Sequence, residues 1–307
     1  MYPHQGYLAG RFMPVSEMAI PVTDAGFSLG TTVTEQLRSF GGKIFQLDQH
    51  LLRLQRSLEI VGIKPLESLS QLAEIATNLV AQNYQLLAPG DDLGLSLFVT
   101  PGGLPRFHNG TQGPPCVGMH TFPLPFQLWD EKYRRGQSLV VTDIEEVAPQ
   151  SWPAELKCRS RMHYYLADLA ASRLEHGARA LLLDANGRVI EASTANILLY
   201  QKEQGFFSPP REVALSGISL LFVQTLAADL GIDWSHRFIV PEELAQADEI
   251  FLTSTPFCLL PVTAFNGEAI HGGFPGPLFT ELAQAWSKRV GIDFIKQASL
   301  FADRIDN

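Results

Sequence analysis

Residues 156–200 constrain the fold of this chain most, because they combine a helix signal, a hairpin signal and a loop of small residues. Apolar residues recur at helical spacing after Ser160, which is predicted to be the N-cap of that helix. A hairpin turn is predicted at Asn186 and Gly187, since both residue types tolerate positive φ. Short apolar segments on either side of the turn are typical of buried strands. The stretch therefore predicts a mixed α/β fold. The apolar stripe of the predicted helix consists of Met162, Tyr165, Leu166, Leu169, Ala170 and Leu174.

Two side chains of opposite charge stand at the ends of these predicted elements. Lys157 immediately precedes the helix, and Glu191 ends the strand that follows the hairpin turn. An isolated lysine and an isolated glutamate are ordinarily solvated surface residues. The surrounding sequence therefore decides whether this amine and this carboxylate belong to a site.

Composition narrows the class of protein. The chain has 307 residues, which is enough for two domains with sizeable cores, and 46% of them are hydrophobic, which is typical of a globular protein. A net charge of −9 argues against binding of nucleic acid, and the absence of a long apolar run argues against a membrane span. The three cysteines favour a reduced, cytoplasmic protein. The eight histidines form no cluster of metal-ligand spacing, so no metal site is expected.

Periodicity also predicts the elements of the first 121 residues. Helices are expected over 49–61 and 68–84, and a buried strand is expected over 91–100. Asp48 is predicted to cap the first of these helices and Gly62 to end it.

The segment Ala180–Glu191, followed by Ser193–Asn196, resembles the central signature of the fold-type IV, or class IV, pyridoxal-phosphate enzymes. This family includes the branched-chain aminotransferases, the D-amino acid aminotransferases and 4-amino-4-deoxychorismate lyase. The resemblance implies that Lys157 forms the Schiff base with pyridoxal 5′-phosphate. It also implies that Glu191 partners the pyridine nitrogen, so that the ring can take up electrons.

The same resemblance implies a two-domain fold for the whole chain. A small N-terminal α+β domain is expected over residues 1–121, and a larger C-terminal pseudo-barrel domain is expected over residues 129–307. The proline-rich residues 122–128 are predicted to be the linker between them. A homodimer is implied by the family and not by the composition.

Further cofactor-binding residues follow from matched motifs. The arginine of His50-Leu-Leu-Arg53-Leu54 is expected to bind the cofactor phosphate, because a guanidinium suits a phosphate group. A glycine turn that leads into a helix is a ready anion site, and here it precedes Ile218 and Ser219. Near the cofactor oxygen, either His163 or Tyr164 is expected. The remaining phosphate-binding residues implied by the resemblance are Ser254 and Thr255.

The substrate pocket matches the family less closely. The resemblance implies a helix over residues 32–38. In this segment Glu35 and Arg38 match the family pattern, but Thr34 replaces the usual aromatic residue. Pro101 stands where D-amino acid aminotransferases carry an arginine that binds the substrate carboxylate. Arg106 and His108 match the later part of the same loop, and Arg106 is one candidate for the missing function.

The expected function is the transfer of an amino group between an amino acid and a 2-oxo acid. One alternative is 4-amino-4-deoxychorismate lyase, which uses the same cofactor and lysine to eliminate pyruvate. A second alternative is a catalytically inactive family member that acts as a binding protein. The identity of the amino donor, its stereochemistry and the oxo-acid acceptor stay open.

Overall fold

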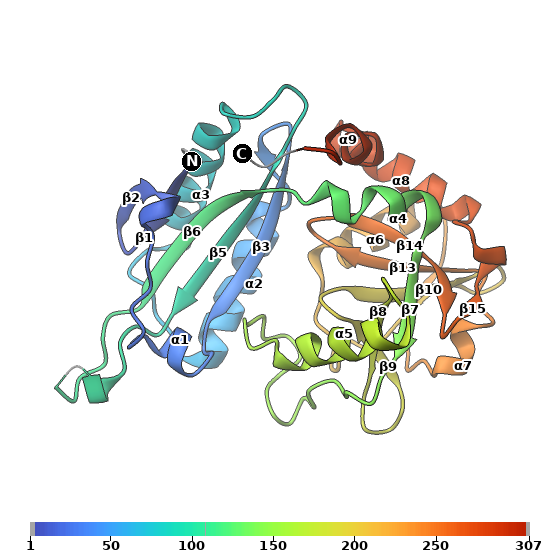
Figure 1. Cartoon of the computed structure of the whole chain (residues 1–307), viewed down its shortest axis with the longest axis horizontal. Coiled ribbons are helices and arrows are strands. Elements are labelled where there is room, and N and C mark those ends of the chain that lie inside the picture. The colour runs from blue at the N-terminus through green and yellow to red at the C-terminus, as the bar shows by residue number, and fades with distance from the viewer. Residues whose placement is uncertain (1–3, 108, 305–307) are drawn as a thin grey trace. The chain divides into compact units, whose positions relative to one another are not determined.

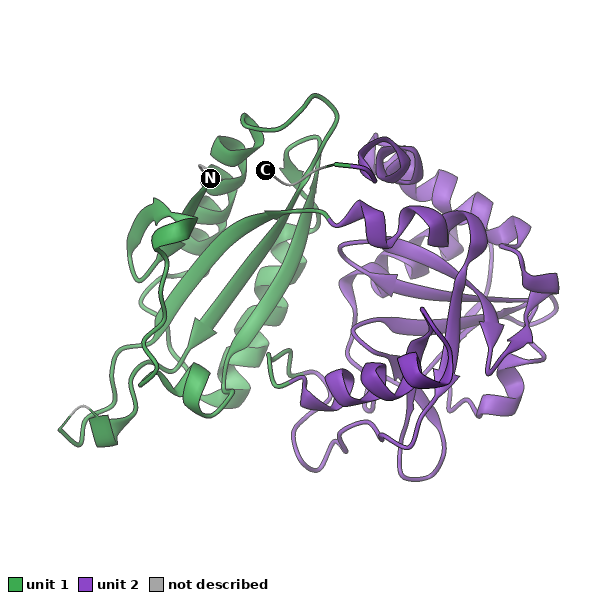
Figure 2. Cartoon of the chain, in the orientation of Figure 1, with its two compact units in different colours: residues 1–124, 156–160, 304–307 green, residues 125–155, 161–303 purple. Residues whose placement is uncertain are grey.

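The computed structural model describes residues 4–107 and 109–304 (Figure 1). These residues divide into two compact units (Figure 2). The first unit contains the described residues up to Leu124, the segment Leu156–Ser160, and Arg304. The second contains Pro125–Glu155 and Arg161–Asp303. No helix within the described ranges is long and apolar enough to cross a membrane.

An antiparallel six-stranded sheet forms the centre of the first unit, in the order β2-β1-β6-β5-β3-β4. The strands are β1 (Gln5–Leu8), β2 (Arg11–Pro14), β3 (Val33–Phe40), β4 (Lys43–Ile44), β5 (Leu93–Thr100) and β6 (Cys116–Pro123). The helical segments of this unit are η1 (Val15–Glu17), α1 (Ala25–Ser28), α2 (Leu47–Val61), α3 (Leu69–Tyr84) and η2 (Pro105–Phe107).

The two faces of this sheet differ in chemistry because side chains alternate along each strand. Leu37, Leu95 and Leu97 lie on one face and pack with the buried residues of α2 and α3 into one core cluster. Thr34 and Ser96 belong to the alternate positions and face the other way. The helices therefore cover the apolar face, and polar side chains lie on the opposite face.

The helix predicted over 32–38 is wrong, because these residues lead into and form most of strand β3. Eight residues of β3 pair with β4 and β5, and β5 begins more than fifty positions further along the chain. Glu35 and Leu37 are both buried on the helix-covered face, which fits a period of two. Pairing over this distance decides the conformation of these residues.

The predicted helix ends of this unit are confirmed at Gly62 but not at Asp48. Gly62 ends α2 in the left-handed conformation at φ 69°, as predicted. Ser68 caps α3, and its side chain accepts a hydrogen bond from Gln71 N. Asp48 is not a cap, because α2 begins one residue earlier and Asp48 lies in its first turn.

The second unit is built on a mixed nine-stranded sheet in the order β12-β11-β10-β13-β14-β7-β8-β9, with β15 paired to β14. A tight turn at residues 193–195 joins β9, at one edge of this order, to β10 near its other end, so the sheet curls back on itself. The strands are β7 (Gln137–Val141), β8 (Arg179–Leu183), β9 (Val189–Ala192), β10 (Asn196–Gln201), β11 (Gly205–Ser208), β12 (Trp234–His236), β13 (Glu249–Ser254), β14 (Cys258–Phe265) and β15 (Glu268–Ala269). The helical segments are η3 (Phe126–Leu128), α4 (Asp130–Arg135), α5 (Met162–Leu174), α6 (Ile218–Asp229), α7 (Pro241–Leu244), η4 (His271–Gly273), α8 (Pro277–Val290) and α9 (Phe294–Phe301).

Helix α5 confirms the helix predicted after Lys157 but not its details. The N-cap is Arg161, while the hydroxyl of Ser160 donates to Gly30 O at 2.7 Å. The small residues Ala167 and Ala171 are the buried residues of α5. The predicted apolar stripe is not a core face, since its large members are exposed. These exposed side chains are Met162, Tyr165, Leu166, Leu169 and Leu174.

The hairpin predicted at Asn186 and Gly187 is present, and Gly187 has a φ of 75°. The predicted linker, residues 122–128, contains the end of β6 and all of η3, and the boundary between the two units, after Leu124, falls within it. The division into separate domains stays a prediction until a fragment is shown to fold alone.

Candidate active site

Lys157 lies on an extended segment that continues the sheet of the first unit beyond β3. Its carbonyl accepts a hydrogen bond from Thr34 N at 3.1 Å, and its own amide donates to Ser57 Oγ at 3.1 Å. The next residue, Cys158, forms an antiparallel bridge with Val33. The backbone of Lys157 is therefore fixed on both sides although no helix or named strand contains it.

Glu35, His50 and Arg53 form a buried charged cluster between β3 and α2. Arg53 donates from Nε to Glu35 Oε1 at 2.8 Å and from Nη2 to Glu35 Oε2 at 2.7 Å. His50 Nδ1 lies 2.8 Å from the same Oε2. Burial opposes ionisation of Glu35, but Arg53 and His50 outweigh it and hold the pKa of this carboxyl well below its usual range.

This cluster changes the interpretation of two predicted site residues. Arg53 is oriented by Glu35, and its contact with a phosphate group stays a prediction. Arg38 does not share a face with Glu35, since the two are three residues apart on a strand. Arg38 instead donates from Nε to Ser39 O at 3.3 Å and stacks on Phe40 with its Cζ 4.1 Å from the ring centroid.

In the second unit, Tyr164 on α5 donates a hydrogen bond to Glu191 on β9. Both side chains are largely buried, and burial together with the Glu191 charge raises the pKa of Tyr164 well above 10. His163 turns elsewhere and lies 3.1 Å from Glu146. Of the two residues that the sequence left open, Tyr164 is therefore the one beside the predicted cofactor carboxylate.

The start of α6 offers hydrogen-bond donors to an anion. Gly217 is its N-cap, and the first-turn amides of Ile218 and Ser219 precede the first intrahelical bonds. The buried hydroxyl of Ser219 has no hydrogen-bond partner within the described residues. These groups fit a phosphate, because both backbone and side chain present N–H or O–H donors.

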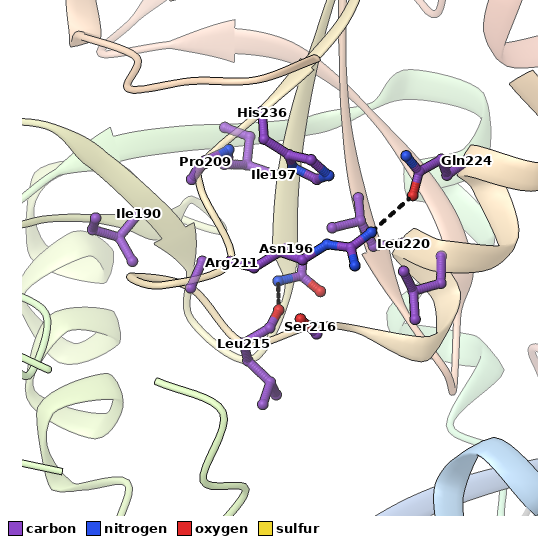
Figure 3. Close-up of a pocket in the computed structure, with 12 residues that line it drawn as sticks. Ile190, Asn196, Ile197, Pro209, Arg211, Leu215, Ser216, Leu220, Gln224 and His236 are labelled. Atoms are coloured by element: carbon purple, nitrogen blue, oxygen red, sulfur yellow. Dashed lines mark hydrogen bonds between the residues drawn. The ribbon is translucent and has the colours of Figure 1, made fainter. Parts of the chain in front are cut away.

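The loop before α6 is held firmly. Asn196 Nδ2 donates to Leu215 O at 2.7 Å, and Figure 3 shows both residues in a pocket beside Ser216. A Cβ on Gly217 would lie 1.8 Å from Asn196 Oδ1, so the close approach requires glycine. Leu220 lines the same pocket.

The remaining predicted residues lie as follows. Ser254 ends β13, and Thr255 is buried in the turn that leads to β14. Thr34 donates to Leu97 O at 3.0 Å. Arg106 is exposed in η2, where it stacks on Phe107, and His108 lies outside the described residues. Within the ranges the structure describes, no group of three acidic, histidine or cysteine side chains could hold a metal ion.

One functional candidate, Arg159, was missed by the sequence analysis. Arg159 Nη2 donates to Ser96 Oγ at 2.7 Å. Alternation of side chains along an extended segment predicts that Arg159 lies on the same face as Lys157. The helix signal after Ser160 instead favoured an interpretation of this segment as the entry to a helix.

Comparison with known proteins shows the family. The family described as amino-transferase class IV matches residues 32–265. D-alanine aminotransferase of Bacillus licheniformis is 31% identical over 272 residues, which cover 88% of this chain and 91% of that protein. Branched-chain-amino-acid aminotransferase of Salmonella typhimurium is 27% identical and covers 90% of each chain.

Solved structures agree in fold. Branched-chain amino acid aminotransferase of Escherichia coli superposes with a TM-score of 0.84 at 23% identity and covers 93% of this chain and 94% of that chain. The branched-chain aminotransferase of the archaeon Thermoproteus uzoniensis, solved with norvaline, gives a TM-score of 0.81 at 23% identity and covers 94% of each chain. The fold and the site thus define a fold-type IV enzyme.

The chain belongs to the class IV aminotransferases, a pyridoxal-phosphate-dependent family, and is an enzyme. Its relatives favour amino-group transfer over the lyase and binding-protein alternatives.

Proposed function

We propose that this enzyme transfers an amino group between an amino acid and a 2-oxo acid with pyridoxal 5′-phosphate bound covalently through Lys157. The observation that carries the proposal is the backbone of Lys157, which Thr34 and Ser57 fix by hydrogen bonds on both sides. The bound cofactor would supply an electron sink for the substrate carbanion. Lys157 Nζ would then carry the proton to and from the substrate Cα as general base and acid.

Glu191 is proposed to accept a hydrogen bond from the protonated pyridine nitrogen. Tyr164 supports this role, because its hydroxyl donates a hydrogen bond that orients the Glu191 carboxylate. A buried carboxylate without such a donor would lose part of its stabilisation. Tyr164 therefore acts on the cofactor through Glu191.

The phosphate is proposed to bind at the start of α6. The amides of Ile218 and Ser219, the Ser219 hydroxyl and the hydroxyl groups of Ser254 and Thr255 would donate hydrogen bonds. Arg53 would add a positive charge that Glu35 holds in a defined orientation.

The substrates are proposed to be a small amino acid and a 2-oxo acid. Relatives include enzymes named for D-alanine and enzymes named for branched-chain amino acids, so both enantiomers should be tested. Thr34, Arg38, Arg106 and His108 are the substrate-pocket candidates from the sequence.

We further propose a cytoplasmic homodimer. The exposed apolar side chains of α5 form an unusual surface for a monomer, because three of them are about two-thirds exposed. These are Met162 at 68%, Tyr165 at 66% and Leu174 at 67%. None of the three cysteines forms a disulfide within the described residues, which fits a reducing compartment.

The visible absorption spectrum of purified protein supplied with pyridoxal phosphate tests the proposal. Wild type should show a band that Lys157→Ala lacks, and the band should shift when a suitable D- or L-amino acid is added. Release of pyruvate from aminodeoxychorismate, with no shift for any amino acid, would support the lyase instead. Absence of any band in wild type would contradict the proposal.

A further inference from the structure

Arg159 is fixed on the polar face of the first unit's sheet, next to Lys157. Its amide donates to Thr32 O at 2.8 Å, which continues the pairing that Lys157 begins with Thr34. Because alternate residues of an extended segment point to the same face, Lys157 and Arg159 share a face. Their backbone positions are about 7 Å apart, since each residue of a strand rises by about 3.3 Å.

The guanidinium of Arg159 is oriented by neutral groups. Nη2 donates to Ser96 Oγ at 2.7 Å, and Nε lies 3.4 Å from Thr34 Oγ1. The Cζ atom stands 5.0 Å from the centroid of the Phe98 ring. These hydroxyl groups and this ring fix the direction of the guanidinium.

The sheet beneath is shaped for this arrangement. A Cβ on Gly118 would lie 2.1 Å from Phe98 Cζ, so only glycine lets the ring lie against the strand. His120, on the same face, has its pKa lowered by burial and also by the charge of Arg159.

We propose that Arg159 binds a carboxylate group of the amino-acid and 2-oxo-acid substrates. The proposal rests on the proposed function, because it uses the proximity of Arg159 to Lys157. A small amino acid that reacts at Lys157 carries its carboxylate on or near the reacting carbon, within the span that separates the two residues. A guanidinium matches a carboxylate because its fork can make two parallel hydrogen bonds. Pro101 has no side-chain donor, and Arg106 stacks on Phe107 in an exposed turn.

The test compares Arg159→Gln with two other arginine variants in cofactor-supplied protein. Arg106→Gln tests the competing candidate, and Arg173→Gln is the control, since Arg173 is exposed on α5. Arg159→Gln should raise KM for amino acids about 10- to 100-fold, the usual effect of losing a charge-assisted hydrogen bond, with a smaller change in kcat. A loss of the same size for Arg106→Gln, with Arg159→Gln unchanged, would overturn the proposal.

Substrates with different numbers of carboxylates identify the bound group. If Arg159 holds the carboxylate on the reacting carbon, Arg159→Gln should impair alanine and glutamate equally and leave a simple amine unaffected. If Arg159 holds a side-chain carboxylate, Arg159→Gln should impair only the reaction with glutamate. Equal effects on alanine, glutamate and the amine would contradict a carboxylate site.

A binding measurement separates this proposal from the proposed function. Isothermal titration with acetate, succinate and the neutral probe acetamide needs no chemistry, so it works in a protein that shows no turnover. Weaker succinate binding in Arg159→Gln, with wild-type circular dichroism, would support the site, and unchanged binding would overturn it. If Arg159→Gln does not fold, Arg159→Lys keeps the charge but not the fork, and intermediate succinate affinity is then expected. Wild-type succinate affinity in Arg159→Lys would contradict the proposed pair of hydrogen bonds from the guanidinium.

Discussion

Arg53 donates two hydrogen bonds, of 2.8 and 2.7 Å, to the Glu35 carboxylate, and this ion pair connects helix α2 with strand β3. The carboxylate is fully buried, and its position inside the helix-covered face of the sheet would be costly without a partner. The pair therefore explains how a strand can place a glutamate among leucines.

Glu35→Gln should destabilise the first unit strongly. The substitution leaves Arg53 without its carboxylate, and breaking a buried ion pair costs about 3–5 kcal/mol of the free energy of unfolding. Urea denaturation measures this loss. Glu59→Gln is the control, because the Arg56–Glu59 pair is exposed and 3.8 Å apart, and it should cost less than about 1 kcal/mol. Equal losses for the two variants would show that the buried Glu35–Arg53 pair stabilises the protein no more than the exposed Arg56–Glu59 pair.

His50 should make the protein less stable as the pH falls below about 6.5, the ordinary pKa of histidine. Burial lowers the pKa of His50 in the folded chain, and the charges of Arg53 and Lys157 add to this effect, although Glu35 opposes it. At low pH the unfolded chain binds a proton at His50 that the folded chain does not bind. Acid therefore lowers the free energy of unfolding by up to about 1.4 kcal/mol per pH unit.

The measurement is the free energy of unfolding at pH 7.5 and pH 5.5 for wild type and His50→Gln. The variant should lose less stability on acidification than wild type. His176→Gln, at an exposed position, serves as the control and should behave like wild type. A His50→Gln variant with the full wild-type pH dependence would refute this assignment.

Tyr164→Phe should destabilise the protein by about 1–3 kcal/mol, because it removes a hydrogen bond to the buried Glu191 carboxylate. It should also weaken retention of pyridoxal phosphate, measured as the Kd from visible absorbance. Tyr165→Phe is a matched control, since the neighbouring ring is 66% exposed, and it should change neither quantity. If both variants have the same stability and the same Kd for pyridoxal phosphate, the Tyr164–Glu191 hydrogen bond contributes to neither.

Ser219→Ala should leave stability unchanged while it weakens cofactor binding several-fold. The Ser219 hydroxyl is buried without a partner in the described part of the chain, so its removal deletes no internal hydrogen bond. Thermal denaturation of the cofactor-free protein and the Kd for pyridoxal phosphate are the two readouts. Thr77→Ala on α3 is the control and should keep wild-type affinity. Wild-type affinity in Ser219→Ala would remove this hydroxyl from the phosphate site.

Leu166→Arg should convert a dimer into a monomer, because it places a charge in the exposed apolar face of α5. Sedimentation velocity measures the change. Leu66→Arg is the control at another exposed leucine, and it should leave the assembly intact. A wild-type protein that sediments as a monomer would contradict the proposed homodimer.

The sequence by itself determined the family and the local signals. The matched segment around Lys157 and Glu191 predicted a fold-type IV enzyme, which the comparisons confirm. Gly62 marked the end of α2 correctly, because capping depends on groups only a few residues apart. The hairpin at Gly187 was equally local.

Only the tertiary structure decided which face of each element is buried. The resemblance implied a helix over residues 32–38, yet pairing with the distant β5 makes most of them a strand. The apolar stripe of α5 is exposed, since Ala167 and Ala171 are the buried residues of this helix. Arg159 gains its neighbours Ser96 and Thr34 from strands far away in the sequence. Local propensities are worth at most about 1 kcal/mol per residue, so long-range pairing and burial outweigh them wherever the two disagree.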